Sequence, residues 1–187
     1  MYRDLKAARA GLRGIIEAMK RFNVLATPAL VAGLAGLLVA CGGDEPVDAA
    51  GTYTISLTNR ENGCNNANWT VGDTASNIGV VITQNGATAS ADVQPGGGRL
   101  ALDLALGGHV FIGKVDGNRL DLLIEGTNSF SMGTCDYTID ARIDAQLDGD
   151  VLSGDVLYQD QTDNSTDCGA LTGCTSRQEL LGNRPPS

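Results

Sequence analysis

The chain has 187 residues, with 13 basic and 22 acidic side chains and a formal net charge of −9. Six of the basic residues but only two of the acidic ones lie before residue 41, so the remaining 147 residues carry a net charge of −13. A surface of this sign repels polyanions, which argues against binding of nucleic acid and against electrostatic attachment to anionic lipid. A segment of 147 residues is the size of one domain.

The first forty residues have the layout of a secretory signal. Basic residues precede an uncharged stretch over 24–40, and small residues lie near its end. We therefore expect a signal helix within residues 1–40. Residues 19–21, which read Met-Lys-Arg, open a complete signal of their own, so residues 1–18 could be a mis-assigned upstream start.

Residues 38–41 read Leu-Val-Ala-Cys and close the uncharged stretch. This run resembles the lipobox of bacterial lipoproteins, in which an aliphatic residue and two small or aliphatic residues precede a cysteine. The resemblance implies that residues 1–40 are removed and that Cys41 becomes the lipid-bearing first residue. Two or three acyl chains, such as palmitate, anchor a protein stably, because each buried methylene contributes about 0.8 kcal/mol. The alternative is an ordinary thiol at the end of a transmembrane helix or a plain signal peptide.

The residue after Cys41 is glycine, not aspartate. Among Gram-negative lipoproteins, this implies transport to the outer membrane. We therefore expect a lipid-anchored protein of the bacterial cell envelope, facing the periplasm or the exterior, with membrane lipid bound through Cys41. Residues 42–50 are polar and aperiodic, so the segment 41–50 is predicted to be a lipidated, flexible tether.

After Gly51, apolar and polar residues alternate with period two, as in half-buried antiparallel strands. In chain order, strands are predicted over 52–57, 80–84, 87–93, 100–106, 110–115, 119–125, 137–147 and 151–159. Residues 178–181 fit either a last strand or a short turn of helix. No segment after Gly51 shows a convincing helical stripe, and the leucines over 100–106 occupy every second position.

Three tight turns separate these strands. Asn-Gly at 85–86, Asp-Gly-Asn at 116–118 and Asp-Gly-Asp at 148–150 supply the backbone conformations that β-hairpins need. Sequentially paired strands in this number twist and tend to close, which removes exposed edges. The expected fold over 51–187 is therefore all-β, an antiparallel meander of about eight strands in an up-and-down β-barrel. An open sandwich is the alternative.

Four cysteines remain in the predicted domain: Cys64, Cys135, Cys168 and Cys174. An even number in an exported chain favours two disulfides, for which three pairings exist. A metal site would need closely spaced pairs such as Cys-x2-Cys, and the sequence has none.

The hairpin meander favours one pairing. A turn centred on Gly149 brings Cys135 opposite a position close to Cys168, and a last strand beside the first brings Cys174 near Cys64. We therefore predict the disulfides Cys135–Cys168 and Cys64–Cys174. The competing pairing joins Cys168 to Cys174 and Cys64 to Cys135.

Gly51, Thr52 and Tyr53 open the first strand, where lipocalins carry Gly-x-Trp. With the hairpins that follow, this resembles the lipocalin-like barrels of bacterial lipoproteins. The resemblance implies that inward residues line a pocket for a small hydrophobic molecule. Small residues are expected to face inward: Ala87, Ala89, Ala91, Ala141, Ala145 and Gly154. They leave either room for a ligand or a closely packed interior.

Candidate catalytic groups are few. His109 is the only histidine, the chain has no Gly-x-Ser-x-Gly motif, and the thiols are expected to be oxidised, so no catalytic residue is assigned. Asp160, Asp163 and Asp167 offer oxygen ligands of the kind that Ca²⁺ takes, but they lack the spacing of an EF-hand loop. We therefore expect no metal and no cofactor.

These features predict a membrane-anchored envelope lipoprotein whose non-catalytic β-domain has a structural or interaction role, with another envelope protein as candidate partner. The alternative is a lipocalin-like binder of a small hydrophobic molecule.

Overall fold

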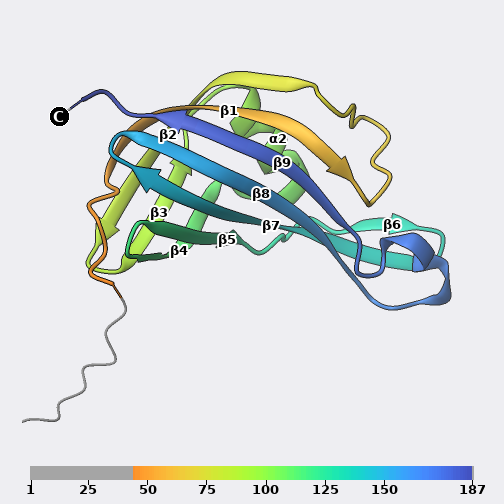
Figure 1. Ribbon diagram of the computed structural model, residues 1–187. Helices are drawn as coiled ribbons and strands as arrows, with labels where there is room; N and C mark the ends of the chain where they lie inside the picture. The colour runs from red at the N-terminus through yellow and green to blue at the C-terminus, as the bar shows by residue number, and fades with distance from the viewer. Residues whose placement is uncertain (1–43, 187) are drawn as a thin grey trace, which may run out of the picture. The chain divides into compact units, whose positions relative to one another are not determined.

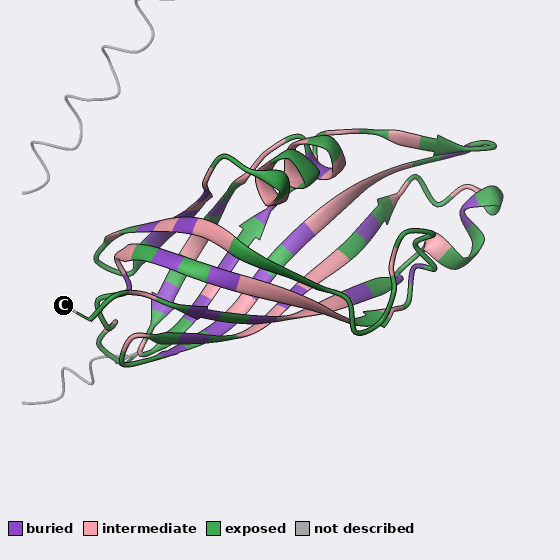
Figure 2. Cartoon of the chain, turned by 90° about the horizontal axis from the view of Figure 1, so that it is seen from above, coloured by how far each residue is buried: buried purple, intermediate pink, exposed green. Residues whose placement is uncertain are grey.

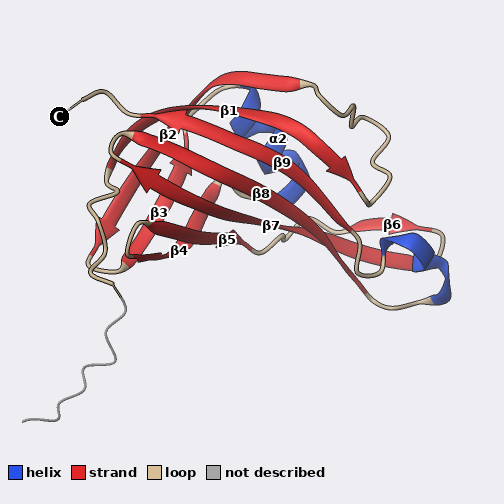
Figure 3. Cartoon of the chain, in the orientation of Figure 1, coloured by secondary structure: helices blue, strands red, loops and turns tan. Residues whose placement is uncertain are grey.

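The computed structural model describes residues 44–186. The first elements of this described part are β1 (Gly51–Asn62), β2 (Thr74–Asn85), β3 (Thr88–Val93), α2 (Gly97–Leu106), β4 (Val110–Asp116) and β5 (Arg119–Ile124). It continues with β6 (Phe130–Met132), β7 (Cys135–Asp148), β8 (Val151–Thr162), the 3-10 helix η2 (Thr166–Leu171) and β9 (Thr175–Asn183) (Figures 1 and 3). No helix within 44–186 is long and apolar enough to cross a membrane.

The strands form an antiparallel barrel. Neighbours follow the order β5-β4-β3-β2-β1-β9-β8-β7, and β5 pairs with β7 to close the ring of eight. The predicted up-and-down barrel is therefore confirmed over the sandwich. The short strand β6 pairs with β7 only at Cys135–Tyr137, whereas β5 pairs with β7 from Ala141 onward. As a result, β6 lies outside the ring.

The barrel has two different ends. The hairpins β2–β3, β4–β5 and β7–β8 meet at one end, which we call the closed end and which lies on the left of Figure 1. Their turns contain Gly86, Gly117 and Gly149, each with a positive φ between 54° and 60°, as the sequence predicts. The longer connections, including α2 and the 63–73 loop, lie at the opposite end, which we call the mouth.

The core follows the alternation of the strands. Buried and exposed positions alternate along them (Figure 2), and the buried side chains of the barrel form one apolar cluster. Ala89, Ala91, Ala141 and Ala145 are buried in it, as expected. Ala87 is exposed, contrary to expectation, because it lies in the β2–β3 turn.

The strand predicted over 100–106 is wrong, since these residues belong to α2. Leu102, Ala105 and Leu106 pack against the core, and their spacing of three and four residues is that of a helix face. Alanine and leucine also favour helix, and Gly107 ends it in the left-handed conformation with its N–H bonded to the Asp103 carbonyl. Leu100, which completes the alternating pattern, is 60 % exposed.

The C-terminal part of the domain forms a strand and not a turn of helix. Residues 178–181, which also fitted a helical turn, lie within β9, and β9 pairs with β1 and β8. The connection between the first two strands is shorter than the predicted strand ranges 52–57 and 80–84 imply, because β1 extends to Asn62 and β2 begins at Thr74.

The segment 44–50 packs against the closed end and is not a loose tether. The Val47 N–H donates to the Gly117 carbonyl at 2.8 Å, and the Gly117 N–H donates to the Asp44 carbonyl at 3.2 Å. Ala49 is fully buried, and its N–H donates to Oε1 of Gln84 at 2.7 Å. The flexible tether predicted for 41–50 is therefore wrong over 44–50. Cys41, the predicted lipid site, lies outside the described residues.

Two cysteine pairs lie at disulfide distance. The Sγ atoms of Cys64 and Cys174 are 2.06 Å apart, and those of Cys135 and Cys168 are 2.11 Å apart. This is the pairing that the hairpin register predicts. The first pair joins the 63–73 loop to the start of β9, and the second joins β7 to η2, so both lie at the mouth end.

Candidate binding cavity in the barrel interior

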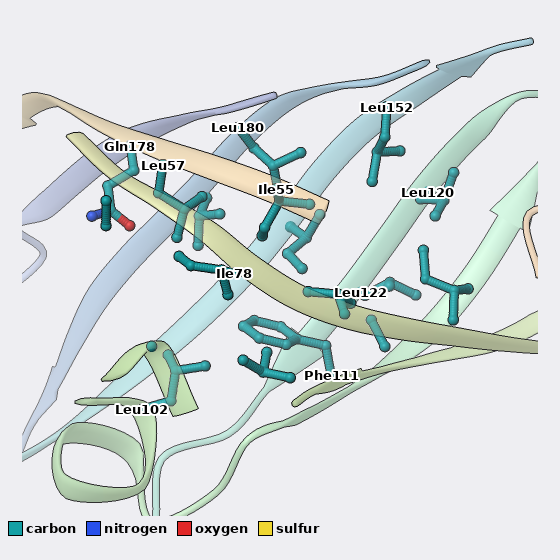
Figure 4. Close-up of a pocket in the computed structure, with 18 of the residues that line it drawn as sticks. Ile55, Leu57, Ile78, Leu102, Phe111, Leu120, Leu122, Leu152, Gln178 and Leu180 are labelled. Carbon is teal, nitrogen blue, oxygen red and sulfur yellow. The ribbon is translucent and has the colours of Figure 1, made fainter. Parts of the chain in front are cut away.

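The barrel interior contains a cavity of about 160 Å³. Its walls are aliphatic side chains from strands all round the barrel, including Ile55, Leu122 and Leu180 (Figure 4). Leu102 reaches it from α2 and Phe111 from β4. Because these side chains come from elements far apart in the sequence, closure of the barrel is what brings them together.

Tyr53 belongs to the buried core and lies near the start of β1, at the closed end. Its side chain is fully buried, and its hydroxyl donates to the Ala49 carbonyl at 3.0 Å. Burial raises the pKa of the Tyr53 hydroxyl, so this group stays neutral. Tyr53 therefore has a structural role at this end of the barrel.

Arg184 fixes this end of the molecule. Its Nε donates to Oδ1 of Asp150 at 2.9 Å, and its Nη1 donates to the carbonyls of Asp48 and Ala50 at 3.0 and 2.9 Å. Its guanidinium carbon lies 5.9 Å from the centre of the Tyr53 ring. One side chain thus ties together the segment before β1, the β7–β8 hairpin and the chain after β9.

The helix α2 covers part of the mouth. Gly98 and Ala101 line the cavity from α2, and a Cβ atom at Gly98 would lie only 3.1 Å from Cγ2 of Ile78. The helix therefore approaches β2 as closely as a glycine allows. Ala75 and Ala101 both line the cavity and are exposed, which marks where it reaches the surface between β2 and α2.

The polar part of the wall is one hydrogen-bonded pair. The Tyr158 hydroxyl donates to Oε1 of Gln178 at 2.8 Å, and Nε2 of Gln178 donates to Oδ1 of Asn59 at 2.7 Å. Burial raises the pKa of the Tyr158 hydroxyl well above its usual range, so the group remains a neutral donor. Trp69 packs edge-on against Tyr158, with 5.8 Å between ring centres.

Trp69 is the only tryptophan in the chain. It lies in the 63–73 loop at the mouth, and its Nε1 is buried without a hydrogen-bond partner among the described residues. Its contact with Tyr158 places an intrinsic fluorophore next to the cavity wall.

His109 holds α2 in place. Its Nδ1 lies 2.7 Å from Oδ1 of Asp103 in α2, and its Nε2 lies 3.8 Å from Oδ1 of Asp92 in β3. Both neighbours are carboxylates, and His109 is not one of the residues that line the cavity. A structural contact between helix and sheet accounts for this residue.

The three aspartates considered as calcium ligands have separate roles. Asp163 accepts from the Ser165 N–H at 2.9 Å and Asp167 accepts from the Thr134 N–H at 2.9 Å, and these bonds lower both carboxyl pKa values. Asp160 is buried, with Oδ2 at 3.4 Å from Sγ of Cys174.

Within 44–186, Asp160 and Asp163 each join a cysteine pair in a compact group of potential metal ligands. The cysteines of each group are at bonding distance from each other, so the thiolates that a metal would need are absent when the pair is oxidised.

Comparison with known proteins adds no relative: no family model, no curated protein and no solved structure matches this chain.

The sequence reasoning missed the contribution of α2 to the cavity. The available signal was the spacing of Leu102, Ala105 and Leu106, which fits a helix better than a strand. The volume left between the side chains has no signal in the sequence pattern.

Proposed function

We propose that the barrel binds a small apolar molecule in its interior while a lipid on Cys41 holds it at a bacterial envelope membrane. The observation that carries the binding proposal is the cavity of about 160 Å³ with its aliphatic walls. A protein cavity of about 150 Å³ lined by leucine, isoleucine and phenylalanine stays dry and binds benzene or xenon. The barrel cavity matches that case in size and lining.

The cavity volume limits the size of the ligand. Pockets for drug-sized molecules enclose roughly 300–1,000 Å³, so this cavity suits a single aromatic ring or a short alkyl chain. For a ligand with six carbon groups, such as a single aromatic ring, burial at about 0.8 kcal/mol per group gives a binding free energy of about 5 kcal/mol. That free energy corresponds to a Kd of about 0.2 mM.

The wall chemistry limits the polarity of the ligand. Among the described lining residues there is no carboxylate, histidine, lysine or arginine. A charged ligand would lose its hydration without gaining a partner, which makes its binding unfavourable. The Tyr158 oxygen keeps acceptor capacity after donating to Gln178, so a ligand with one hydroxyl is compatible with the site. Because the wall is almost wholly aliphatic and Tyr158 is held as a neutral donor to Gln178, we infer a binding role.

Support for the anchor comes from residues 38–41 and from the signal-like segment before them. Lipidation predicts that the mature chain begins at a mass-shifted Cys41 in membrane fractions. Replacement of Cys41 by alanine should release the protein from the membrane or block its processing. A mature chain that begins at another residue, or an unmodified Cys41, would overturn the anchor.

A second candidate is an interaction role with another envelope protein. Leu100 and Leu104 are 60 % and 67 % exposed on the outer side of α2, one helical turn apart. Exposed leucines at this spacing are typical of a helix that packs against a partner. Loss of a co-purifying envelope protein on replacement of both by serine would support this role.

Benzene titration followed by calorimetry tests the binding proposal. Ala91 is buried on the cavity wall, so Ala91→Leu fills part of the volume and should abolish binding. Ser90→Leu adds a similar bulk on the same strand but on its outer side, and should leave binding intact. Equal binding by both variants, or no saturable binding by the unmodified protein, would contradict the proposal.

A further inference from the structure

The outer surface of strands β4 and β5 carries three exposed aliphatic side chains, which we call the β4–β5 face. Val110, Ile112 and Leu123 are 38 %, 61 % and 38 % exposed. Ile112 is directly opposite Leu123 in the β4–β5 pairing, and Val110 lies two residues from Ile112 on the same side of its strand. The three side chains therefore form one continuous apolar patch.

Charges of both signs lie beside this patch, where Asp92 is directly opposite Val110. Lys114 is directly opposite Asp121, and Asp116 is opposite Arg119. Arg119 also bonds to Oδ1 of Asp144 at 2.8 Å. Positive and negative groups thus alternate beside the β4–β5 face, although the chain after residue 40 carries a net charge of −13. The lysine and arginine side chains reduce, at this face, the repulsion from anionic lipid that the composition predicts.

The N-terminal segment reaches the barrel on the same hairpin. Gly117, at the tip of β4–β5, donates from its N–H to the Asp44 carbonyl, and its carbonyl accepts from the Val47 N–H. The lipid position, Cys41, lies three residues before Asp44, with only Gly42 and Gly43 between them. Three residues span at most about 11 Å. A lipid on Cys41 therefore holds the tip of this hairpin next to the bilayer.

We propose that the β4–β5 face docks on the bilayer that holds the Cys41 lipid. The inference rests on the proposed anchor and does not depend on whether the cavity binds a ligand. Anchoring makes docking intramolecular, so a small apolar patch that would not hold a free domain can be occupied at the high effective concentration near the surface. The barrel then lies with one side on the membrane and does not swing on a tether.

Paramagnetic relaxation by lipid headgroups tests this orientation. The full mature lipidated protein is placed in phosphatidylethanolamine–phosphatidylglycerol bilayers that contain a headgroup spin label, and backbone amide signals are measured. We expect several-fold stronger broadening at Ile112 and Leu123 than at Leu181. Leu181 is a matched control, because it is 50 % exposed on the outer side of β9, across the barrel from β5.

Variants separate the possible outcomes. Ile112→Asp should reduce the difference between the two sides of the barrel, whereas Leu181→Asp should leave it unchanged. Equal broadening on both sides, strongest broadening at the hairpin turns alone, or no effect of Ile112→Asp would overturn the proposed face. Shifts of the same signals with protein concentration in the absence of lipid would instead identify a second copy as the occupant, which also overturns it. Absence of the lipid on Cys41, seen by mass spectrometry, would show that the anchor has failed.

Discussion

Arg184 links three segments at the closed end of the barrel, so its replacement tests how much these contacts contribute to stability. Arg184→Ala removes the bond to Asp150 and the two bonds to the carbonyls of Asp48 and Ala50. It also removes the cation over the Tyr53 ring. The Arg184 side chain is only 19 % exposed, so water replaces these contacts poorly.

The expected loss of stability is large for the replacement of a single arginine. A hydrogen bond that involves a charged group contributes about 1.5–3 kcal/mol, and an exposed cation–π contact contributes about 0.5–1 kcal/mol. Because the acceptors are partly accessible to water after the change, we expect a loss of about 2–4 kcal/mol in the free energy of unfolding. For a domain of this size, such a loss lowers Tm by roughly 5–15 °C.

Urea denaturation followed by circular dichroism measures the effect. Arg142→Ala is the control, because Arg142 also pairs with a carboxylate, Asp121, but is 50 % exposed. Exposed pairs contribute about 0–1 kcal/mol, so the control should change little. Arg184→Lys keeps the charge but not the planar fork, and should recover only part of the loss. Equal losses for Arg184→Ala and Arg142→Ala would refute the role assigned to Arg184.

Three further changes have defined outcomes. Burial raises the pKa of the Asp160 carboxyl in the folded protein, so ionisation of this group lowers the free energy of unfolding. This destabilisation is absent below the ordinary carboxyl pKa of about 3.9 and is complete above the raised, folded-state pKa. Asp160→Asn should therefore stabilise the protein against urea at pH 7 but not at pH 3, and a loss at pH 7 would contradict this. A Cβ atom at Gly154 would lie 2.2 Å from the Asp144 carbonyl oxygen, so Gly154→Ala should cost about 1–3 kcal/mol in urea unfolding, whereas Gly108→Ala, with open space, should cost less. Replacement of Cys64 and Cys174 by alanine, which opens a loop of 110 residues, should cost about 1 kcal/mol more in urea unfolding than loss of the other cysteine pair, with its separation of 33; the reverse order would contradict the chain-entropy argument.

The strands and the cysteine pairs were predictable because both follow from residue positions along the chain: the period-two alternation and the register that a turn imposes. The period of two places alternate residues on the core side of a strand, and a turn at Gly149 fixes which residues are opposite each other in β7 and β8. The same alternation failed over 100–106, because leucine at every second position also satisfies part of a helical spacing. The close approach of Gly98 to Ile78, which holds α2 over the mouth, is a tertiary contact that the local pattern does not contain.

The packing of residues 44–50 could not be predicted from the sequence pattern either, because it also depends on tertiary contacts. The segment is short, polar and aperiodic, yet its partners Gln84 and Gly117 are far along the chain. Only closure of the barrel brings these groups together. The cavity has the same origin, because its volume is set by how side chains from many strands fit, and not by the pattern of any one strand.

Crystallography under xenon pressure tests the central claim, a dry cavity that accepts a small apolar molecule, most directly. Xenon should bind inside the barrel, close to Phe111, Leu122 and Leu102, and the site should be lost in Ala91→Leu. An interior without a xenon site, or one filled with ordered water bonded to Tyr158 and Gln178, would contradict the proposed binding function.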